Sequence, residues 1–209
     1  MTFTPPPRAA LVIAFDGVLA DTLPLRHEAL ASAAAQHGVA RTEDELWPAI
    51  AGRTMAESVD ALRANRPVAW AMDETTRDLL VLTAQRAYHR RLAHGVTFRP
   101  SVVARLRQAA LSGERVILRA DSARSDVAPL LAVLGIEPLV TWLRASDDPS
   151  APSMTAGIPS VEHSWRAIGA RLDRWHCDPT RVDVQESCAV AAAAAAPFAH
   201  RIRTIDEAW

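Results

Sequence analysis

Runs of apolar residues alternate with amphipathic segments along the chain, and their spacing predicts where strands and helices lie. Residues 9–15 (AALVIAF) form a continuous apolar run that ends before Asp16 and Gly17, which is typical of a buried strand in a parallel sheet. Apolar positions then recur at helical spacing over 25–37, 43–51, 55–64 and 73–94, and glycine or proline follows each segment closely. The chain from residue 24 to residue 94 is therefore predicted to be helical, without a strand.

The pattern changes after residue 95, where helices and strands alternate. Helices are predicted over 101–111, 126–134, 160–172 and 187–196, and strands over 115–120, 139–143, 182–185 and 201–205. Such alternation predicts a parallel sheet with helices on both faces. We expect a Rossmann-like α/β core domain (1–22 and 95–209) and a helical cap domain (23–94) inserted after the first strand. Ligands of such sheets bind beyond the carboxyl ends of the strands.

Composition and charge exclude several classes of protein. Of the 209 residues, 49% are hydrophobic and 22% are charged, which is typical of a globular protein with a sizeable core. The formal net charge of −1 provides no electrostatic footprint for nucleic acid or an anionic membrane. No apolar run approaches the roughly 18 residues of a membrane span, and the first residues lack the pattern of a secretory signal. We therefore expect a cytoplasmic protein that binds neither nucleic acid nor membranes.

The first predicted strand leads into a pattern of acidic and apolar residues that is informative about chemistry. Residues 12–22 read VIAFDGVLADT. This segment resembles the first motif of the haloacid dehalogenase (HAD) superfamily, in which an apolar strand ends in Asp-x-Asp-Gly-Val-x-x-Asp-Ser/Thr. The resemblance is to the β-phosphoglucomutase and phosphoglycolate phosphatase branch, extends over nearly the whole chain and includes the turn Gly52-Arg53-Thr54 in the predicted cap. It implies phosphoryl transfer by one aspartate that attacks phosphorus and a second that acts as acid and base.

The aspartate pair is incomplete in this sequence. Alignment on the residues from Gly17 onward places Asp16 at the acid/base position and Ala14 at the nucleophile position. A shifted register would make Asp16 the nucleophile. That register would put Val18 at the acid/base position and would break the match to Gly-Val-x-x-Asp-Thr. The resemblance therefore implies a site without its nucleophile.

The other three motifs of the superfamily are altered as well. The hydroxyl that holds a phosphate oxygen corresponds to Ala120, whose methyl group cannot donate a hydrogen bond. Ser122 could substitute for it, although a serine at this place also suits a turn or a helix cap. The lysine that neutralises the phosphate corresponds to Asp148, and the sequence contains no lysine. The acidic Mg²⁺ ligand corresponds to Glu186, which with Asp16 would form a weak or vestigial metal site.

Three functions are consistent with these residues. The first is a catalytically degenerate HAD-like hydrolase homologue, a pseudoenzyme without a cofactor, that binds an unknown protein partner or a small phosphorylated ligand through Ser122, Arg53 and Arg119. The alternative is a divergent HAD-family phosphatase or phosphomutase that uses Mg²⁺, with Asp16 as general base and Arg119 or Arg144 supplying positive charge. The third is a structural subunit of a larger assembly, which predicts an extensive apolar patch on the cap or on the tryptophan-bearing helices.

Overall fold

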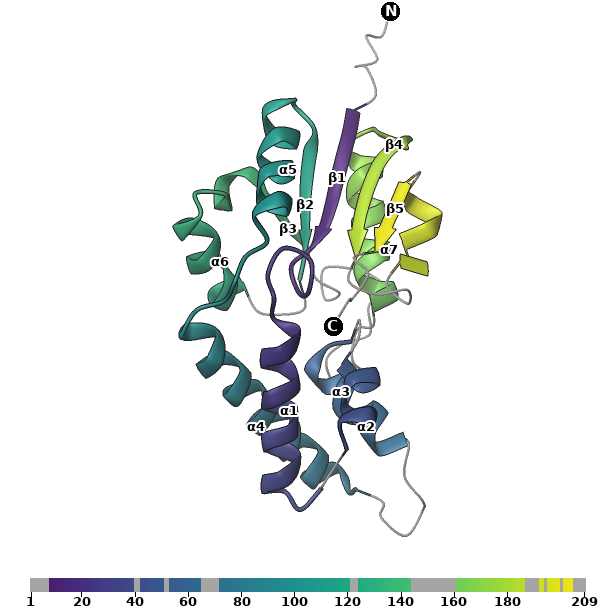
Figure 1. The fold of residues 1–209 in the computed structure, drawn as a ribbon. Helices are drawn as coiled ribbons and strands as arrows, with labels where there is room; N and C mark the ends of the chain where they lie inside the picture. Colours follow the sequence, from purple (N-terminus) through teal and green to yellow (C-terminus); the bar gives the residue numbers. More distant parts are fainter. Residues whose placement is uncertain are drawn as a thin grey trace, which may run out of the picture.

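A computed structural model describes residues 8–39, 42–50, 53–64, 72–120, 124–143, 161–186, 192–193, 195–199 and 201–204 of the chain. The strands within these ranges are β1 (Arg8–Ala14), β2 (Arg115–Arg119), β3 (Thr141–Leu143), β4 (Cys177–Glu186) and β5 (Arg201–Thr204). The helices are α1 (Leu23–Gln36), α2 (Glu43–Ile50), α3 (Met55–Ala64), α4 (Glu74–Ala93), α5 (Pro100–Leu111), α6 (Arg124–Val133) and α7 (Val161–Arg174) (Figure 1).

The strands form one parallel sheet in the order β3-β2-β1-β4-β5. The first strand lies in the centre, and its apolar run explains why, since a central strand is covered on both faces. Leu11 and Ile13 pack with α5 and α6, whereas Ala10 and Val12 pack with α7. The predicted α/β class, a parallel sheet with helices on both faces, is confirmed.

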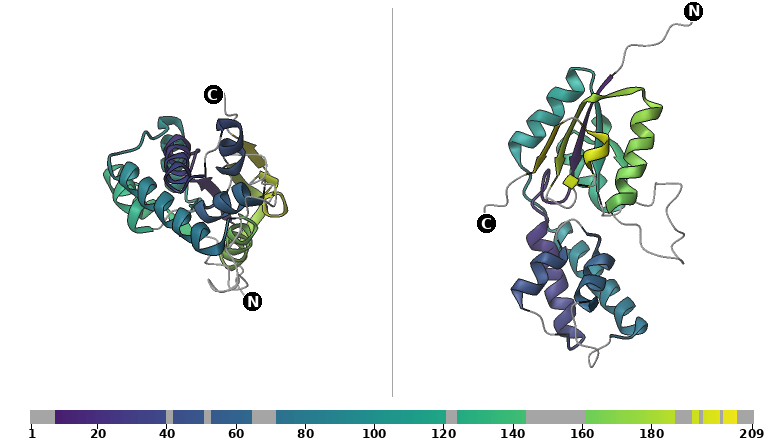
Figure 2. Two further views of the ribbon diagram at one scale, coloured as in Figure 1. Left: turned by 90° about the horizontal axis from the view of Figure 1, so that it is seen from below. Right: turned by 90° about the vertical axis from the view of Figure 1, so that its right-hand side faces the viewer.

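Helices α1 to α4 pack on one another in a separate layer next to the sheet. Figures 1 and 2 show this layer beyond the carboxyl ends of the strands, with the arrowheads of the strands pointing toward it. The helical layer begins after the loop that follows β1 and returns to the sheet through α5. The division into a core domain (1–22 and 95–209) and a cap domain (23–94), as two units that fold separately, stays a prediction.

Most element boundaries agree with the sequence pattern to within two residues, and β4 is the main exception. This strand begins at Cys177, five residues before the predicted start. The prediction missed its first half because Asp178-Pro179 is typical of a turn. The pairing with β1 shifts register here, from Arg8 beside Cys177 to Ala10 beside Val182. The Asp178 carboxylate accepts hydrogen bonds from the backbone and side chain of Thr180, which holds the irregular segment. The predicted helix over 187–196 lies largely outside the described residues.

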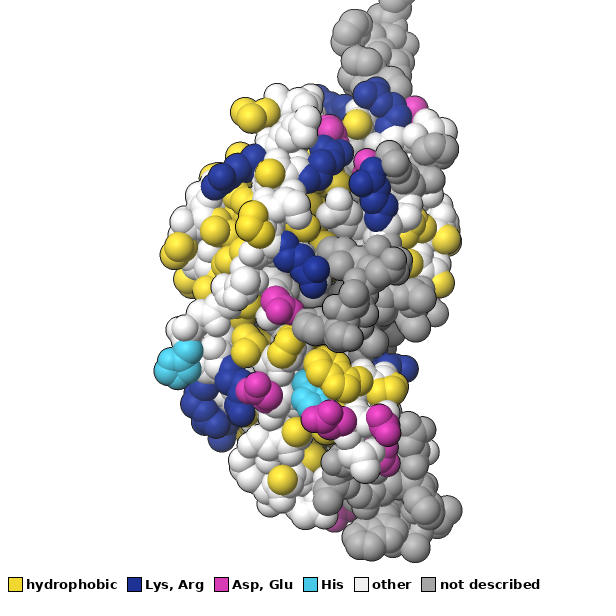
Figure 3. All heavy atoms as spheres, in the orientation of Figure 1, with side chains coloured by type: hydrophobic (Ala, Val, Ile, Leu, Met, Phe, Trp, Pro, Cys, Tyr) yellow, Lys and Arg dark blue, Asp and Glu magenta, His cyan; other side chains and the backbone are white. Residues whose placement is uncertain are grey.

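The surface of the described residues carries mixed charges and scattered apolar side chains. Figure 3 shows basic and acidic groups interspersed on one face of the molecule. Trp165 is fully buried and stacks on Phe198, so this tryptophan belongs to the core. Within the described ranges, no helix has both the length and the apolar character needed to cross a membrane. The large exposed apolar side chains come from α2, α4, α5 and α6 and are Trp47, Leu79, Leu82, Leu111 and Val133.

Candidate functional site

The loop that follows β1 presents Asp16 at the carboxyl edge of the sheet. Gly17 has φ = 75°, a left-handed conformation that glycine adopts without steric cost, and it lets the chain turn back on itself. The backbone N–H of Leu19 then donates to the carbonyl of Ala14 at 3.1 Å. The N–H of Phe15 donates to the carbonyl of the last residue of β2 at 2.7 Å. These bonds hold the loop after β1 against the ends of β1 and β2.

The Asp16 carboxylate is buried and is held by two hydroxyl groups. Its Oδ1 atom accepts hydrogen bonds from Thr22 Oγ1 at 2.7 Å and from the Tyr88 hydroxyl at 3.2 Å. Tyr88 lies on α4, so the second bond joins the helical layer to the loop of the core. The Oδ2 atom is also buried and has no hydrogen-bond partner among the described residues. A buried carboxylate with one unsatisfied oxygen can accept a proton or a ligand donor.

Three neighbouring strands end in residues that stand side by side. Ala14, the last residue of β1, pairs with Arg119, the last residue of β2. On the other side of β1, Ile13 pairs with Gln185, so Ala14 stands beside Glu186 at the end of β4. The expected nucleophile position therefore lies between a cationic and an anionic residue.

Arg119 and Glu186 form a buried ion pair. The Nε atom of Arg119 donates to Oε1 of Glu186 and its Nη2 atom donates to Oε2, both at 2.7 Å. The side chain of Arg119 is 2% exposed and that of Glu186 is 0% exposed. Removing two charges from water is costly, and such a pair persists only with good geometry on both oxygens, as found here.

Two positions at this edge carry methyl groups, Ala14 at the end of β1 and Ala120 directly after β2. Ala14 is 1% exposed and Ala120 is 0% exposed, and both methyl groups belong to the hydrophobic core. The backbone N–H of Ala120 donates to the carbonyl of Leu143 at 3.3 Å, so Ala120 is still bonded to β3. Neither position offers a nucleophile or a hydrogen-bond donor from its side chain.

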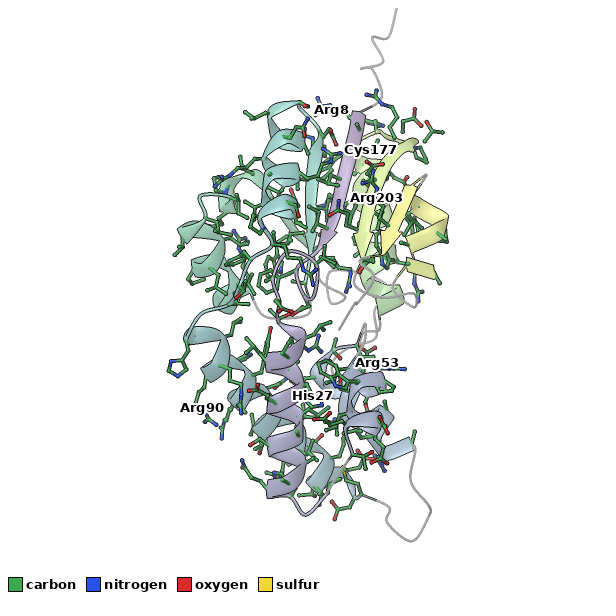
Figure 4. The ribbon with its side chains drawn as sticks, viewed as in Figure 1. Arg8, His27, Arg53, Arg90, Cys177 and Arg203 are labelled. Carbon is green, nitrogen blue, oxygen red and sulfur yellow. The ribbon has the colours of Figure 1, made fainter. Side chains whose placement is uncertain are left out.

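In the helical layer, arginine and aromatic side chains lie at the end nearest the sheet. Arg53 donates to the carbonyl of Pro48, and its own carbonyl accepts a hydrogen bond from the buried Arg26. The His27 ring stacks on Trp47, with 4.4 Å between the ring centroids. Figure 4 shows Arg53 and His27 on this side of the layer.

Comparison with known proteins identifies the fold. No protein-family model matches the sequence, and no curated protein matches it. Solved structures do match. A hydrolase from Pseudomonas syringae has a TM-score of 0.71 and 14% identity, over 94% of this chain and 94% of its own. CbbY from Rhodobacter sphaeroides, in complex with xylulose-(1,5)bisphosphate, has a TM-score of 0.69 and 16% identity, over 95% of this chain and 87% of its own. A β-phosphoglucomutase from Clostridium difficile has a TM-score of 0.68 and 17% identity, over 91% and 81%.

This chain has the HAD fold. Other matching structures include a hydrolase of the haloacid dehalogenase-like family from Streptococcus pneumoniae. The predicted fold of the phosphatase and β-phosphoglucomutase branch is thereby confirmed, and the identities are too low for the comparisons to carry an activity.

Among the described residues, the row of Ala14, Arg119 and Glu186 does not fit a magnesium ion. Mg²⁺ requires several oxygen ligands at short distance in near-octahedral geometry. Both oxygens of Glu186 accept hydrogen bonds from the Arg119 guanidinium, and Ala14 supplies no carboxylate. A second cation would also lie close to the guanidinium charge in a buried setting, where the repulsion is weakly screened.

The sequence-predicted site residues fall into three groups. Ala14, Arg119 and Glu186 lie together in one row, and Asp16 lies in the adjoining loop. Arg53 lies in the helical layer, and Ala120 faces the core. The remaining candidates lie outside the described residues and are Ser122, Arg144 and Asp148. The roles assigned to these residues stay predictions.

Two contacts at this site were not anticipated from the sequence. Tyr88 is 72 positions from Asp16, and a buried tyrosine on an amphipathic helix carries no signal that distinguishes it from a core residue. Arg119 and Glu186 are 67 positions apart and were assigned to a ligand and a metal respectively, not to each other. The available signal was their position, since Arg119 lies near the end of one predicted strand and Glu186 directly follows another.

Proposed function

We propose that this chain is a catalytically degenerate HAD-fold protein, a pseudoenzyme that has lost phosphoryl transfer and uses the fold to bind a small phosphorylated ligand or a protein partner. The observation that carries the proposal is the buried methyl group of Ala14 at the end of β1. A methyl group cannot attack phosphorus, and loss of a covalent nucleophile typically costs several orders of magnitude in rate.

The surroundings of Ala14 support the same proposal. The buried methyl group of Ala120 lies at a position that the sequence resemblance assigns to a hydroxyl, and both oxygens of Glu186 accept hydrogen bonds from Arg119. Asp16 is held on one oxygen by the hydroxyls of Thr22 and of Tyr88 on α4. Changes at three separate strand ends are not compensated by one remaining carboxylate, because groups that act as a unit lose their effect together.

The test is a turnover assay of the full chain with phosphate monoesters, sugar phosphates and Mg²⁺. We expect no rate above the buffer background and no difference between the wild-type protein and Asp16→Asn. A HAD-fold phosphatase prepared in the same way is the positive control. A rate far above background that disappears in Asp16→Asn would overturn the proposal.

The alternative, a divergent phosphatase or phosphomutase with Asp16 as general base, is favoured by one observation. The Oδ2 atom of Asp16 is buried and has no hydrogen-bond partner among the described residues, so it could accept a proton from water or a hydroxyl. The same assay separates the two functions. Under the alternative, activity is lost in Asp16→Asn and retained in the matched control Asp73→Asn, which changes an aspartate at the start of α4.

The proposal also includes the setting in which the protein works. We propose a cytoplasmic location and a partner that is neither nucleic acid nor a membrane; the net charge of −1 and the interspersed charges in Figure 3 support the second part. Arg53 is our candidate for a phosphate contact, since guanidinium groups bind such anions with paired N–H donors.

A further inference from the structure

A single row of side chains crosses the carboxyl edge of the sheet. Arg119 pairs with Ala14, and the register of β1 with β4 brings Glu186 to the opposite side of Ala14. Residues that pair in neighbouring strands project from the same face of a sheet. Arg119 and Glu186 therefore extend toward each other over one residue, Ala14.

The spacing of the strands limits which residue can occupy position 14. Neighbouring strands lie about 4.8 Å apart, so β2 and β4 are separated by about 10 Å across β1. Arg119 and Glu186 nevertheless meet in two hydrogen bonds of 2.7 Å, so their side chains together span the strand between them. The methyl group of Ala14 leaves this path open. A carboxylate at this position would project into the space that the guanidinium fills.

The bridging guanidinium supplies a fixed positive charge at this edge. Arginine stays protonated at every physiological pH. The pair is nearly inaccessible to water, with exposed fractions of 2% and 0%, so its charges are poorly screened. A divalent cation would have to displace the guanidinium from both oxygens of Glu186 in order to bind here.

We propose that Arg119 is the resident cation of this strand edge, matched to the small residue Ala14, and that its guanidinium takes the place that Mg²⁺ occupies in HAD-fold enzymes. The charge of Glu186 at this strand edge is consequently balanced without a divalent metal ion. This inference concerns the cation alone, and it would stand even if the protein proved to turn over a phosphate ester.

The first experiment titrates the wild-type protein with Mn²⁺, which accepts the same oxygen ligands as Mg²⁺ and is detected by electron paramagnetic resonance. We expect no saturable binding that depends on Glu186. Any binding that is equal in wild type and in Glu186→Gln arises elsewhere on the protein and is subtracted. Wild-type binding of Mn²⁺ that disappears in Glu186→Gln would overturn the proposal.

The second experiment rebuilds a metal site. The double variant Ala14→Asp/Arg119→Ala removes the guanidinium and places two carboxylates side by side, so we expect Mn²⁺ to bind roughly tenfold or more tightly than to wild type. Ala14→Asp alone keeps the guanidinium and should gain no affinity. The matched control is Arg77→Ala, because Arg77 also binds one carboxylate, that of Asp60, through Nε and Nη2, at 2.8 and 2.9 Å. This control should gain no affinity.

Two results would contradict the proposal in the rebuilt protein. One is a gain of Mn²⁺ affinity in Ala14→Asp alone that equals the gain in the double variant, because the guanidinium would then not exclude the metal. The other is a folded double variant with no gain. If the double variant does not fold with or without Mn²⁺, the wild-type titration decides the question, and neither experiment depends on measured turnover.

Discussion

Arg119 and Glu186 depend on each other for their place in the core, which makes the energetics of single residues testable. Arg119→Met leaves the Glu186 carboxylate buried without a cation, and we expect it to lower the free energy of unfolding by about 3–5 kcal/mol. The double variant Arg119→Met/Glu186→Leu removes both charges and should recover most of this loss, because replacing a buried pair with apolar residues is often neutral. Chemical denaturation of the three proteins measures these differences.

A partly exposed ion pair provides the control for this prediction. Arg77 binds Asp60 on the surface of the helical layer, with side-chain exposures of 16% and 42%. Arg77→Met should cost about 1 kcal/mol or less, since water screens the pair and solvates the carboxylate that remains. An equal loss of unfolding free energy in Arg119→Met and Arg77→Met would contradict the expectation that burial makes the loss of the Arg119 cation more costly.

The sequence predicted individual residues at this edge better than it predicted their partners. Ala14 and Glu186 were identified by alignment with the motifs of the superfamily that the sequence resembles, and Arg119 because it follows Leu118 near the end of a predicted strand. Their contacts require the strand order and the register, which bring residues 67 positions apart to within hydrogen-bond distance. Asp16 was identified from its motif, whereas its bond to Tyr88 depends on how α4 meets the loop, and no local pattern encodes that geometry.

At the scale of elements, the spacing of apolar residues located most helices and strands, because an element that is buried on one face repeats apolar residues at its own period. The predicted helix over 55–64 matches α3, and the predicted strand over 115–120 ends one residue beyond β2. The failure at β4 has a physical cause: the bulged pairing with β1 accommodates a proline and an Asx-type turn that ordinarily end a strand. Local propensity was overridden by pairing with the central strand.

The start of α4 supports a prediction about pH. Asp73 caps this helix by accepting the backbone N–H of Thr76 at 2.6 Å, and this bond holds the pKa of Asp73 below its ordinary value of 3.8. A carboxyl group whose pKa is lowered by folding stabilises the fold above its unfolded-state pKa, and this contribution is lost as the pH falls through the lower folded-state pKa. We therefore expect Asp73→Asn, which keeps a capping oxygen, to be less stable than wild type only above that range.

The measurement is the denaturation midpoint of both proteins from about pH 6 down to about pH 3, a range that spans the titration of aspartate. The difference between wild type and Asp73→Asn should narrow toward zero at the acid end. Asp78→Asn on the same helix, where the carboxylate is 69% exposed, is the matched control. A difference that stays constant with pH would rule out a contribution from the charge of Asp73.

At the scale of the whole molecule, two chain connections, a shared hydrophobic cluster and the hydrogen bond from Tyr88 to Asp16 join the helical layer to the sheet. One connection leads from the β1 loop into α1, and the other leads from α4 into α5. Thr22 donates to the same oxygen of Asp16 from the beginning of the helical layer, close to Asp16 in the chain, so its hydroxyl holds the loop locally. Only the Tyr88 hydroxyl reaches this carboxylate from α4, and it should therefore restrain the layer relative to the sheet.

Tyr88→Phe tests this restraint, because it removes one hydroxyl and preserves the buried ring. A hydrogen bond to a charged group contributes about 1.5–3 kcal/mol, so we expect a loss of that order in the free energy of unfolding. We also expect faster amide hydrogen exchange at the end of α4 nearest the sheet. Thr22→Val removes the other hydroxyl from the same oxygen and should lower stability without accelerating exchange in α4. Equal exchange in α4 for the two variants would show that the Tyr88 bond stabilises Asp16 but does not hold the two layers together.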